Sequence, residues 1–179
     1  SVRVVAPSSP TLRVENACRR DGDTVICGID EVGRGAWAGP VTVGAVVAAP
    51  ERPRTLTGVR DSKDLSPHRR NEADVAVRAW APAVGIGHAS HAECDEFGMT
   101  EALRLAGTRA LAQVAEQGHD PDRILLDGPH NYLGFGDRVT EYQSDTGYAA
   151  RGGITTIVNY LLSGENFTDV FAREHETAR

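Results

Sequence analysis

Apolar, β-branched runs alternate with a segment of helical periodicity along the middle of this chain. Three runs bounded by glycine or polar residues predict strands at 24–30, 41–47 and 83–90. The connection between the first two is rich in glycine and of hairpin-like length. We therefore expect these two strands to be neighbours in one sheet.

The clearest helix is predicted over residues 100–117. Leu103 and Val114 belong to an apolar series with helical spacing in this segment. Thr100 is a candidate N-cap, and Gly118 is placed to end the helix. The segment therefore indicates a helix with one apolar face.

A fourth apolar strand is predicted directly after this helix, at 123–128, and it carries Asp127 near its end. Strand, helix and strand in succession imply an α/β domain with some parallel pairing. Residues 1–22, rich in proline, serine and arginine, are expected to form a flexible arm. The remainder, 23–179, is expected to form a single domain.

The charged and polar residues just before the long helix have simple interpretations. Glu93, Asp95 and Glu96 precede that helix and favour its positive N-terminus. His88 and His91 lack a nearby cysteine or third histidine, so we expect them to be surface polar residues rather than metal ligands.

Composition adds bounds on size and location. A length of 179 residues fits one domain, and 40% apolar with 25% charged residues is typical of globular proteins. No apolar run approaches the roughly 20 residues that span a bilayer, and the first residues do not resemble a signal peptide. Three widely spaced cysteines favour a reducing compartment. We therefore expect a cytoplasmic monomer without membrane contact.

The net charge of −6 argues against a protein that coats nucleic acid, because such binding depends on lysine and arginine neutralising phosphates. A nuclease remains open, since carboxylates that bind metal ions gain positive charge from those ions.

Acidic residues end two of the predicted strands. Asp30 and Asp127 would converge if their strands are neighbours, because ligands bind at the carboxyl ends of strands in open α/β sheets. Glu31 could join them only if the chain leaves the strand at that residue, since side chains alternate between faces. Converging carboxylates suit Mg²⁺ or Mn²⁺, and two such ions about 4 Å apart can cleave a phosphodiester. A simple turn or helix-capping role is the alternative.

The loop that follows these acids contains Gly33, Arg34 and Gly35. Its glycines would let a phosphate or sugar hydroxyl approach the backbone closely, and the arginine could donate hydrogen bonds to it. By itself this pattern is a weak signal and is usually just a turn.

Four segments together resemble ribonuclease HII, in the order "GIDEVGRGAWAGPVTVGAVV", "GVRDSKDLSPHRR", "ECDEFGMTEALRLAGTRAL" and "ILLDG". The resemblance implies a ribonuclease H-like fold with a mixed central β-sheet flanked by helices. It also implies cleavage of the RNA strand of RNA–DNA hybrids, and 5′ of ribonucleotides in duplex DNA. The products would be 5′-phosphate and 3′-hydroxyl ends, with Mn²⁺ or Mg²⁺ as cofactor.

The same resemblance assigns roles to individual residues. The matching metal-binding and catalytic acids are Asp30, Glu31 and Asp127. The loop that would read the 2′-hydroxyl, the group that distinguishes ribose from deoxyribose, is Gly33, Arg34 and Gly35. A further substrate-contacting stretch contains Ser62 and Lys63, which without the family context would be a solvated turn before a helix starting at Ser66-Pro67.

Two features of the family pattern are not matched. The fourth carboxylate and its helix are absent, so we expect a family-typical segment to be missing between Thr140 and Glu141; either the chain lost it or the sequence omits it. Neither Asp145 nor Asp169 has a matching context. The family's tyrosine at the RNA–DNA junction falls at Gly153 or Ile154, which makes junction preference less secure than hybrid cleavage.

Two other functions stay open on the sequence alone. A catalytically silent relative that binds hybrids would be consistent with loss of the fourth acid. A different nuclease of the same fold, such as a resolvase, is a third possibility, although the predicted ribose-reading loop argues against it.

Overall fold

The computed structural model describes residues 12–34, 40–49, 66–127 and 130–142. Its centre is a five-stranded sheet with the order β3-β2-β1-β4-β5. The strands are β1 Ile26–Val32, β2 Val41–Val47, β3 Val84–Ala89, β4 Arg123–Asp127 and β5 Val139–Tyr142. Strand β2 runs antiparallel to β1 and β3, whereas β4 is parallel to β1 and β5. The expected mixed α/β sheet is therefore confirmed.

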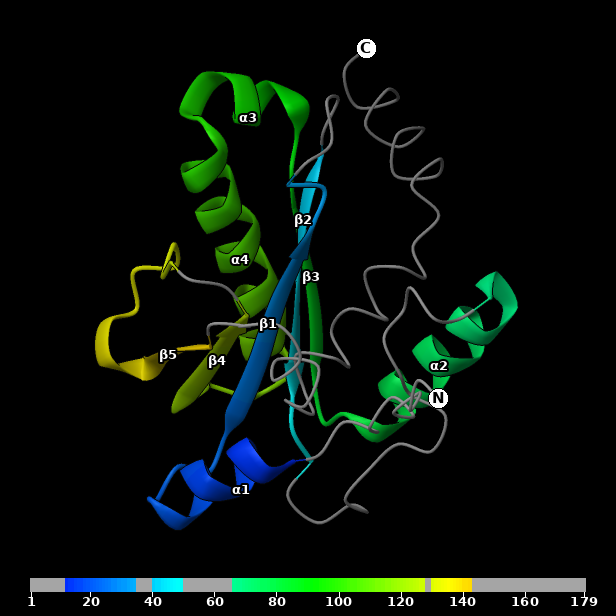
Figure 1. Cartoon of the computed structure of the whole chain (residues 1–179), viewed down its shortest axis with the longest axis vertical. Coiled ribbons are helices and arrows are strands. Elements are labelled where there is room, and N and C mark those ends of the chain that lie inside the picture. Colours follow the sequence, from blue (N-terminus) through cyan, green and yellow to red (C-terminus); the bar gives the residue numbers. More distant parts are fainter. Residues whose placement is uncertain (1–11, 35–39, 50–65, 128–129, 143–179) are drawn as a thin grey trace, which may run out of the picture.

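Helices cover both faces of this sheet. They are α1 Arg13–Arg20, α2 Pro67–Trp80, α3 His91–Phe97 and α4 Met99–Glu116, and a short 3₁₀ helix spans Gly136–Arg138. Helix α4 lies along one face, while α1 and α2 lie on the other side (Figure 1). Strand alternation divides the core accordingly, because Ile29 and Leu126 pack on the α4 side and Ile26 and Leu125 pack on the α1/α2 side.

Several element boundaries agree closely with the sequence pattern. Residues 41–47 form β2 as expected, and α4 differs from the predicted 100–117 by one residue at each end. Gly118 follows it with φ +86°, a conformation that suits glycine at a helix end. The expected cap was wrong, however, since Gly98 precedes the helix and Thr100 lies within its first turn. Ser66 caps α2, as expected.

Two expectations about helices were wrong. Residues 13–20, within the expected flexible arm, form α1, and Leu12 just before it is buried against the sheet. Residues 1–11 lie outside the described part of the chain. Glu93 belongs to a separate helix, α3, where it forms a capping box with Ser90. The Glu93 side chain therefore caps the N-terminus of α3, instead of interacting with the N-terminus of α4 as expected.

Helix α4 approaches β3 unusually closely because the strand carries two glycines. A Cβ on Gly85 would lie 2.0 Å from the carbonyl oxygen of Ala110, and one on Gly87 would lie 2.0 Å from that of Ala106. Any larger residue at these positions would push the helix away from the sheet.

This close approach lets α4 cover the open edge of the sheet. Gln113 accepts from the N–H of Ile86 at 3.0 Å and donates to its carbonyl at 2.7 Å. Gln117 makes the same pair of bonds with Val84, at 3.2 and 2.7 Å. Backbone groups on an edge strand otherwise invite pairing with another chain. The side-chain amides of the two glutamines therefore make the backbone hydrogen bonds that a further strand beside β3 would make.

We expect replacement of Gln113 and Gln117 together by alanine to lower the free energy of unfolding by about 2 kcal/mol, because four modest hydrogen bonds are lost. Urea unfolding measures the effect, and light scattering reports association through the uncovered edge. The matched control is Glu116→Ala, at an exposed position of the same helix. An unchanged urea midpoint in the double variant would contradict this role.

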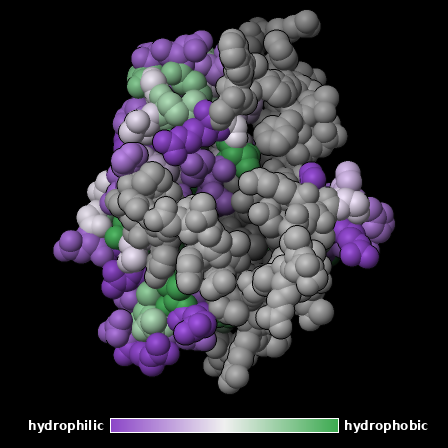
Figure 2. All heavy atoms as spheres, in the orientation of Figure 1, coloured by the Kyte–Doolittle hydropathy of each residue, from purple (hydrophilic) through white to green (hydrophobic). Residues whose placement is uncertain are grey.

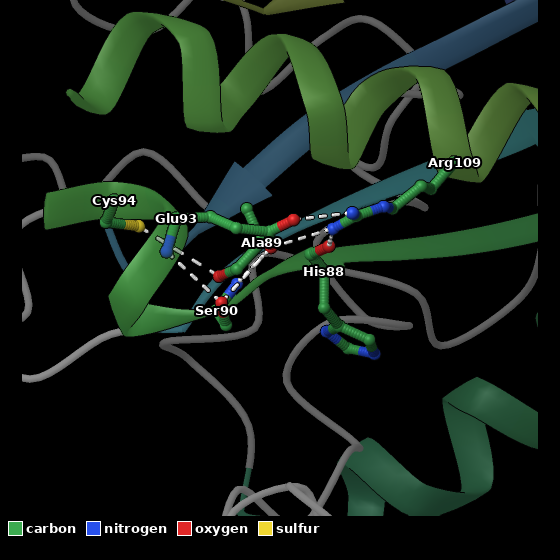
Figure 3. Close-up of polar contacts among 6 residues, drawn as sticks. All are labelled: His88, Ala89, Ser90, Glu93, Cys94 and Arg109. Atoms are coloured by element: carbon green, nitrogen blue, oxygen red, sulfur yellow. Dashed lines mark hydrogen bonds and ion pairs between the residues drawn. The ribbon is translucent and has the colours of Figure 1, made fainter. Parts of the chain in front are cut away.

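A polar network fixes the junction of β3, α3 and α4 (Figure 3). Arg109 of α4 donates to the carbonyl of His88 at 2.5 Å, and its guanidinium reaches both oxygens of Glu93, at 2.6 and 3.0 Å. Glu93 also accepts from the N–H of Ser90 at 2.9 Å. The imidazole of His88 makes a further hydrogen bond, because its Nδ1 lies 2.8 Å from the hydroxyl oxygen of Thr42.

This network predicts a specific acid sensitivity. The hydrogen bond from Arg109 lowers the pKa of Glu93 from an ordinary 4.5 to about 2. A depressed pKa in the folded state gives stability that is complete above pH 4.5 and is lost as the pH falls towards 2. We expect Arg109→Gln to flatten this part of the stability profile, measured by urea unfolding at several pH values. The matched control is Arg78→Gln, which breaks the ion pair of Arg78 with Asp74 on the surface of α2 and should leave this part of the profile unchanged.

The described surface is largely hydrophilic on the face drawn in Figure 2, with smaller apolar areas between. The large exposed apolar side chains, Val75, Phe97 and Phe135, come from three separate parts of the chain. Single exposed apolar residues are ordinary on protein surfaces. No helix in the described ranges is both long and apolar enough to span a bilayer.

Candidate active site

The pairing of β1 with β4 brings two of the predicted acids together. The strands are parallel, and their register ends with Ile29 opposite Leu126. Continuing it by one residue brings Asp30 next to Asp127, both at the carboxyl ends of central strands. On the other side of β1, Gly44 of β2 lies opposite Asp30, and glycine has no side chain to place beside that carboxylate. The strand pairing on which the predicted convergence depends is therefore present, and the metal-binding role of the two acids stays a prediction.

Glu31 does not meet the condition under which its side chain would join those of Asp30 and Asp127. The chain does not leave the strand at this residue, because β1 continues to Val32 and still pairs with β2 there. Alternation therefore places Asp30 and Asp127 on the α1/α2 face and directs Glu31 to the α4 face. Asp30 and Asp127 therefore lie at this end of the sheet on one face, and Glu31 lies on the opposite face.

Asp30 is held firmly at this edge. The residue is 7% exposed, and its Oδ1 accepts from the backbone N–H of Glu31 at 2.8 Å. A buried carboxylate is costly unless charges or hydrogen bonds compensate it. The position therefore favours a bound cation.

Of the two carboxylate oxygens of Glu31, one accepts a hydrogen bond and the other does not. Its Oε1 accepts from Arg34 Nη1 at 3.3 Å, whereas Oε2 is buried and has no hydrogen-bond partner among the described residues. Burial raises the pKa of Glu31, Arg34 opposes this shift, and the charge of Asp127 adds to it. Burial also raises the pKa of Asp127. The sheet edge thus concentrates poorly solvated negative charge.

These side chains fit a hard divalent cation, although they do not enclose one. Within the described ranges, no three His, Cys, Asp or Glu side chains are grouped closely enough to hold an ion. Mg²⁺ usually keeps several waters and binds through one or two carboxylates together with substrate phosphates. Asp30 and Asp127 could supply those carboxylates, and a cation would offset the desolvation that raises the pKa of Asp127.

The loop after β1 begins with a glycine that the structure requires. Gly33 has φ +88°, and a Cβ at this residue would lie 2.6 Å from the carbonyl oxygen of Pro40. Arg34, whose side chain is 49% exposed, extends from the same turn. The other predicted substrate-binding residues, Gly35, Ser62 and Lys63, lie outside the described residues, so their roles stay predictions.

One residue beside the acids was missed by the sequence analysis. Tyr132, in the connection between β4 and β5, is 8% exposed and packs in the core on the α4 side. Its phenol lies within the electrostatic influence of Glu31, Asp30 and Asp127. An aromatic residue soon after a strand that ends in an acid was the available signal, but only tertiary packing brings it back to the acids.

The suspected break in the family pattern falls within β5. Leu125 pairs with Thr140 and Leu126 with Glu141, so the strand runs through that point. The positions discussed for a fourth acid or a junction tyrosine, Asp145, Gly153, Ile154 and Asp169, lie outside the described residues.

Comparison with known proteins identifies similar chains. The family model described as Ribonuclease HII matches residues 27–148. A curated ribonuclease HII from Streptomyces coelicolor is 49% identical over 131 residues, which cover 73% of this chain and 54% of the relative. The chain spans about half the length of the curated relatives it matches.

Solved structures share the fold. The PCNA:RNase HII complex from Archaeoglobus fulgidus includes a chain that matches with a TM-score of 0.64 and 19% identity, over 87% of this chain and 79% of that one. The structure of Bst-RNase HIII in complex with Mn²⁺ matches with a TM-score of 0.58 and 20% identity, over 99% of this chain and 60% of that one. At these identities the likeness supports the ribonuclease H-like fold.

Proposed function

The chain belongs to the ribonuclease HII family, and on this basis we propose that it is a metal-dependent endoribonuclease. It hydrolyses the RNA strand of RNA–DNA hybrids and cuts 5′ of ribonucleotides embedded in duplex DNA, leaving 5′-phosphate and 3′-hydroxyl ends. The observation that carries this proposal is the parallel pairing that brings Asp30 beside Asp127 at the carboxyl ends of β1 and β4.

The acids supply the metal-binding part of the site. Asp30 and Asp127 would hold Mn²⁺ or Mg²⁺, which supplies activation of water and stabilisation of the leaving oxygen when bound. Glu31 completes the acidic edge from the other face of β1. The likeness to a Mn²⁺-bound structure of the same fold is consistent with this assignment.

The loop from Gly33 to Gly35 supplies selectivity for ribose. Gly33 permits a turn that a side chain would obstruct, and Arg34 is exposed enough to reach a substrate while still bonded to Glu31. The 2′-hydroxyl can both donate and accept hydrogen bonds, so backbone groups in this loop can recognise it. The family resemblance gives Ser62 and Lys63 the role of contacting substrate, where the lysine would meet a phosphate.

The test compares three 5′-labelled duplexes: an RNA–DNA hybrid, a DNA duplex with one ribonucleotide, and the same DNA duplex without it. Each is incubated with Mn²⁺, with Mg²⁺ and with EDTA. We expect metal-dependent cleavage of the first two and none of the third. Binding of the hybrid without cleavage in either metal would instead support a silent relative, and cleavage of all-DNA junctions would support a resolvase.

The intact mass of the protein used in this assay tests whether a segment is missing between Thr140 and Glu141. An intact mass equal to that of these 179 residues would rule out a missing segment. If the mass is larger, peptide mapping across Thr140 and Glu141 shows whether the additional residues lie between them. A cytoplasmic location and a monomeric state stay predictions from the sequence.

A further inference from the structure

A pair of polar side chains lies at the end of the sheet where Asp30 and Asp127 are found. Towards its other end, the α1/α2 face of β1, β2 and β3 is apolar, with Ile26, Val46, Ala48, Val84 and Ile86 in or against the core. Where β1 and β3 end and β2 begins, Thr42 lies opposite His88 on one side and Val32 on the other. Polar groups therefore replace apolar ones on these strands at the acidic end of the sheet.

Thr42 and His88 share the face of the two acids. The neighbours of Thr42 in β2, Val41 and Val43, pack on the α4 side, so alternation directs Thr42 to the α1/α2 side. Nδ1 of His88 lies 2.8 Å from the Thr42 hydroxyl oxygen, which places the imidazole on the same side. In Figure 3 the ring of His88 points away from Arg109 and α4. Both residues thus lie on the face that carries Asp30 and Asp127.

The strand register gives the separation of His88 from the acids. Asp30 lies opposite Gly44, which in turn lies opposite Ile86. His88 is two residues beyond Ile86, so ordinary strand spacing and rise place it about 12 Å from Asp30 across the sheet. A phosphate held at the acids is too far away for His88 to contact. A substrate group that meets His88 must therefore be another phosphate of the same duplex.

His88 is held from both faces of β3. Arg109 donates to its backbone carbonyl at 2.5 Å from the α4 side, and Thr42, which is 2% exposed, bonds to the ring from the other side. Because a buried hydroxyl proton needs an acceptor, we assign the Thr42 hydroxyl as the donor and Nδ1 as the acceptor. A neutral imidazole that accepts at Nδ1 carries its proton on Nε2. Nε2 is therefore a hydrogen-bond donor in a fixed direction.

We propose that His88 is a substrate-binding residue whose Nε2 donates a hydrogen bond to a backbone phosphate of the bound duplex, other than the phosphate that is cut. Thr42 is a positioning residue that orients the imidazole. The inference rests on the proposed function for the identity of the ligand. An acidic edge repels phosphates, so a duplex that binds there needs donors placed around the acids. His88 supplies such a donor on the same face.

The test compares two amides at position 88. The side-chain nitrogen of glutamine reaches about as far as Nε2, whereas that of asparagine reaches about as far as Nδ1 and stays near Thr42. Binding of a labelled RNA–DNA hybrid is measured by fluorescence anisotropy, with Asp30→Asn in every protein to prevent cleavage. We expect His88→Asn to weaken binding about tenfold and His88→Gln to stay within about threefold of the parent. The reverse order would overturn the inference, since it would show that His88 only satisfies Thr42.

Thr42 provides a second comparison, which also decides the matter if His88→Asn does not fold. Thr42→Val keeps the shape of the side chain and removes the hydroxyl, whereas Thr42→Ser keeps the hydroxyl. We expect Thr42→Val to weaken hybrid binding about threefold and Thr42→Ser to leave it unchanged. In the His88→Asn background, Thr42→Val should have no further effect. Equal affinities of the two Thr42 variants would overturn the positioning role.

The phosphate is located with hybrids that carry one uncharged methylphosphonate linkage, moved stepwise along each strand. We expect one position, away from the cleaved linkage, to weaken binding to the Asp30→Asn parent about tenfold and to have little effect on its His88→Asn derivative. If the two proteins respond alike at every position, the inference is wrong.

His119→Asn is the matched control. His119 lies between α4 and β4, at the opposite end of the sheet from the acids, and this change should leave hybrid affinity unchanged. With Asp30 intact, His88→Asn should raise KM with little change in kcat. If the wild-type protein binds the hybrid without cutting it, the proposed function fails and the affinities still decide the role of His88. If it does not bind the hybrid, both are wrong.

Discussion

Replacement of Asp30 by Asn is expected to lower kcat/KM on either ribonucleotide-containing duplex at least about a thousandfold, even at saturating Mn²⁺. The change keeps the size of the side chain and an oxygen that can accept from the N–H of Glu31. It removes the negative charge that lies beside Asp127 at the acidic edge. Initial rates of cleavage of a labelled duplex, with enzyme in excess for the slow variant, measure the loss.

The same change should not unfold the protein. Because Asp30 is 7% exposed, neutralising it removes the cost of burying a charge, and we expect the free energy of unfolding without metal to stay the same or rise. Asp127→Asn should behave in parallel. The control is Asp95→Asn, an exposed acid of α3. Cleavage by Asp30→Asn at the wild-type rate would refute the assignment of this site.

The elements that local pattern predicts well are those whose pattern and packing agree. Strand β2 is buried along its whole length, so its β-branched run has only one interpretation. Helix α1 was missed because it is short and strongly polar, and it is stabilised by the packing of Val14, Cys18 and the neighbouring Leu12 in the core on the α1/α2 side. The break between α3 and α4 depends on Gly98 with φ +80°, a backbone choice that the apolar spacing does not reveal.

In the candidate site, too, some features could be predicted from the sequence and others could not. The convergence of Asp30 and Asp127 was predictable to the extent that both acids lie near the carboxyl ends of apolar strands, and β1 and β4 do pair in parallel. The face occupied by Glu31 was not, since it depends on two more residues of pairing between β1 and β2. The position of Tyr132 could not be predicted from the sequence, because it depends on a close approach of the ring to Gly107 of α4.

Replacement of Gly33 by Ala is expected to lower kcat/KM by about a hundredfold, because misplacing a substrate-positioning group by about 1 Å has an effect of that size. The left-handed φ of +88° disfavours a side chain, and the new Cβ would lie 2.6 Å from the carbonyl oxygen of Pro40, so the backbone must shift. Arg34 would move with it and lose its alignment with Glu31. Discrimination between ribonucleotide-containing and all-DNA duplexes should fall as well, if this loop recognises ribose.

Gly22→Ala separates this local effect from general backbone strain. Gly22 also has a positive φ, +109°, but a Cβ there would have no atom within 4 Å, and the residue follows α1 at the other end of β1. We expect this control to lose about 1 kcal/mol of stability and no activity. Equal losses of activity in the two variants, measured on the same duplexes with urea unfolding in parallel, would contradict a substrate-positioning role for the Gly33 turn. A loss confined to Gly33→Ala would connect the conformation of this turn to the acids beside it.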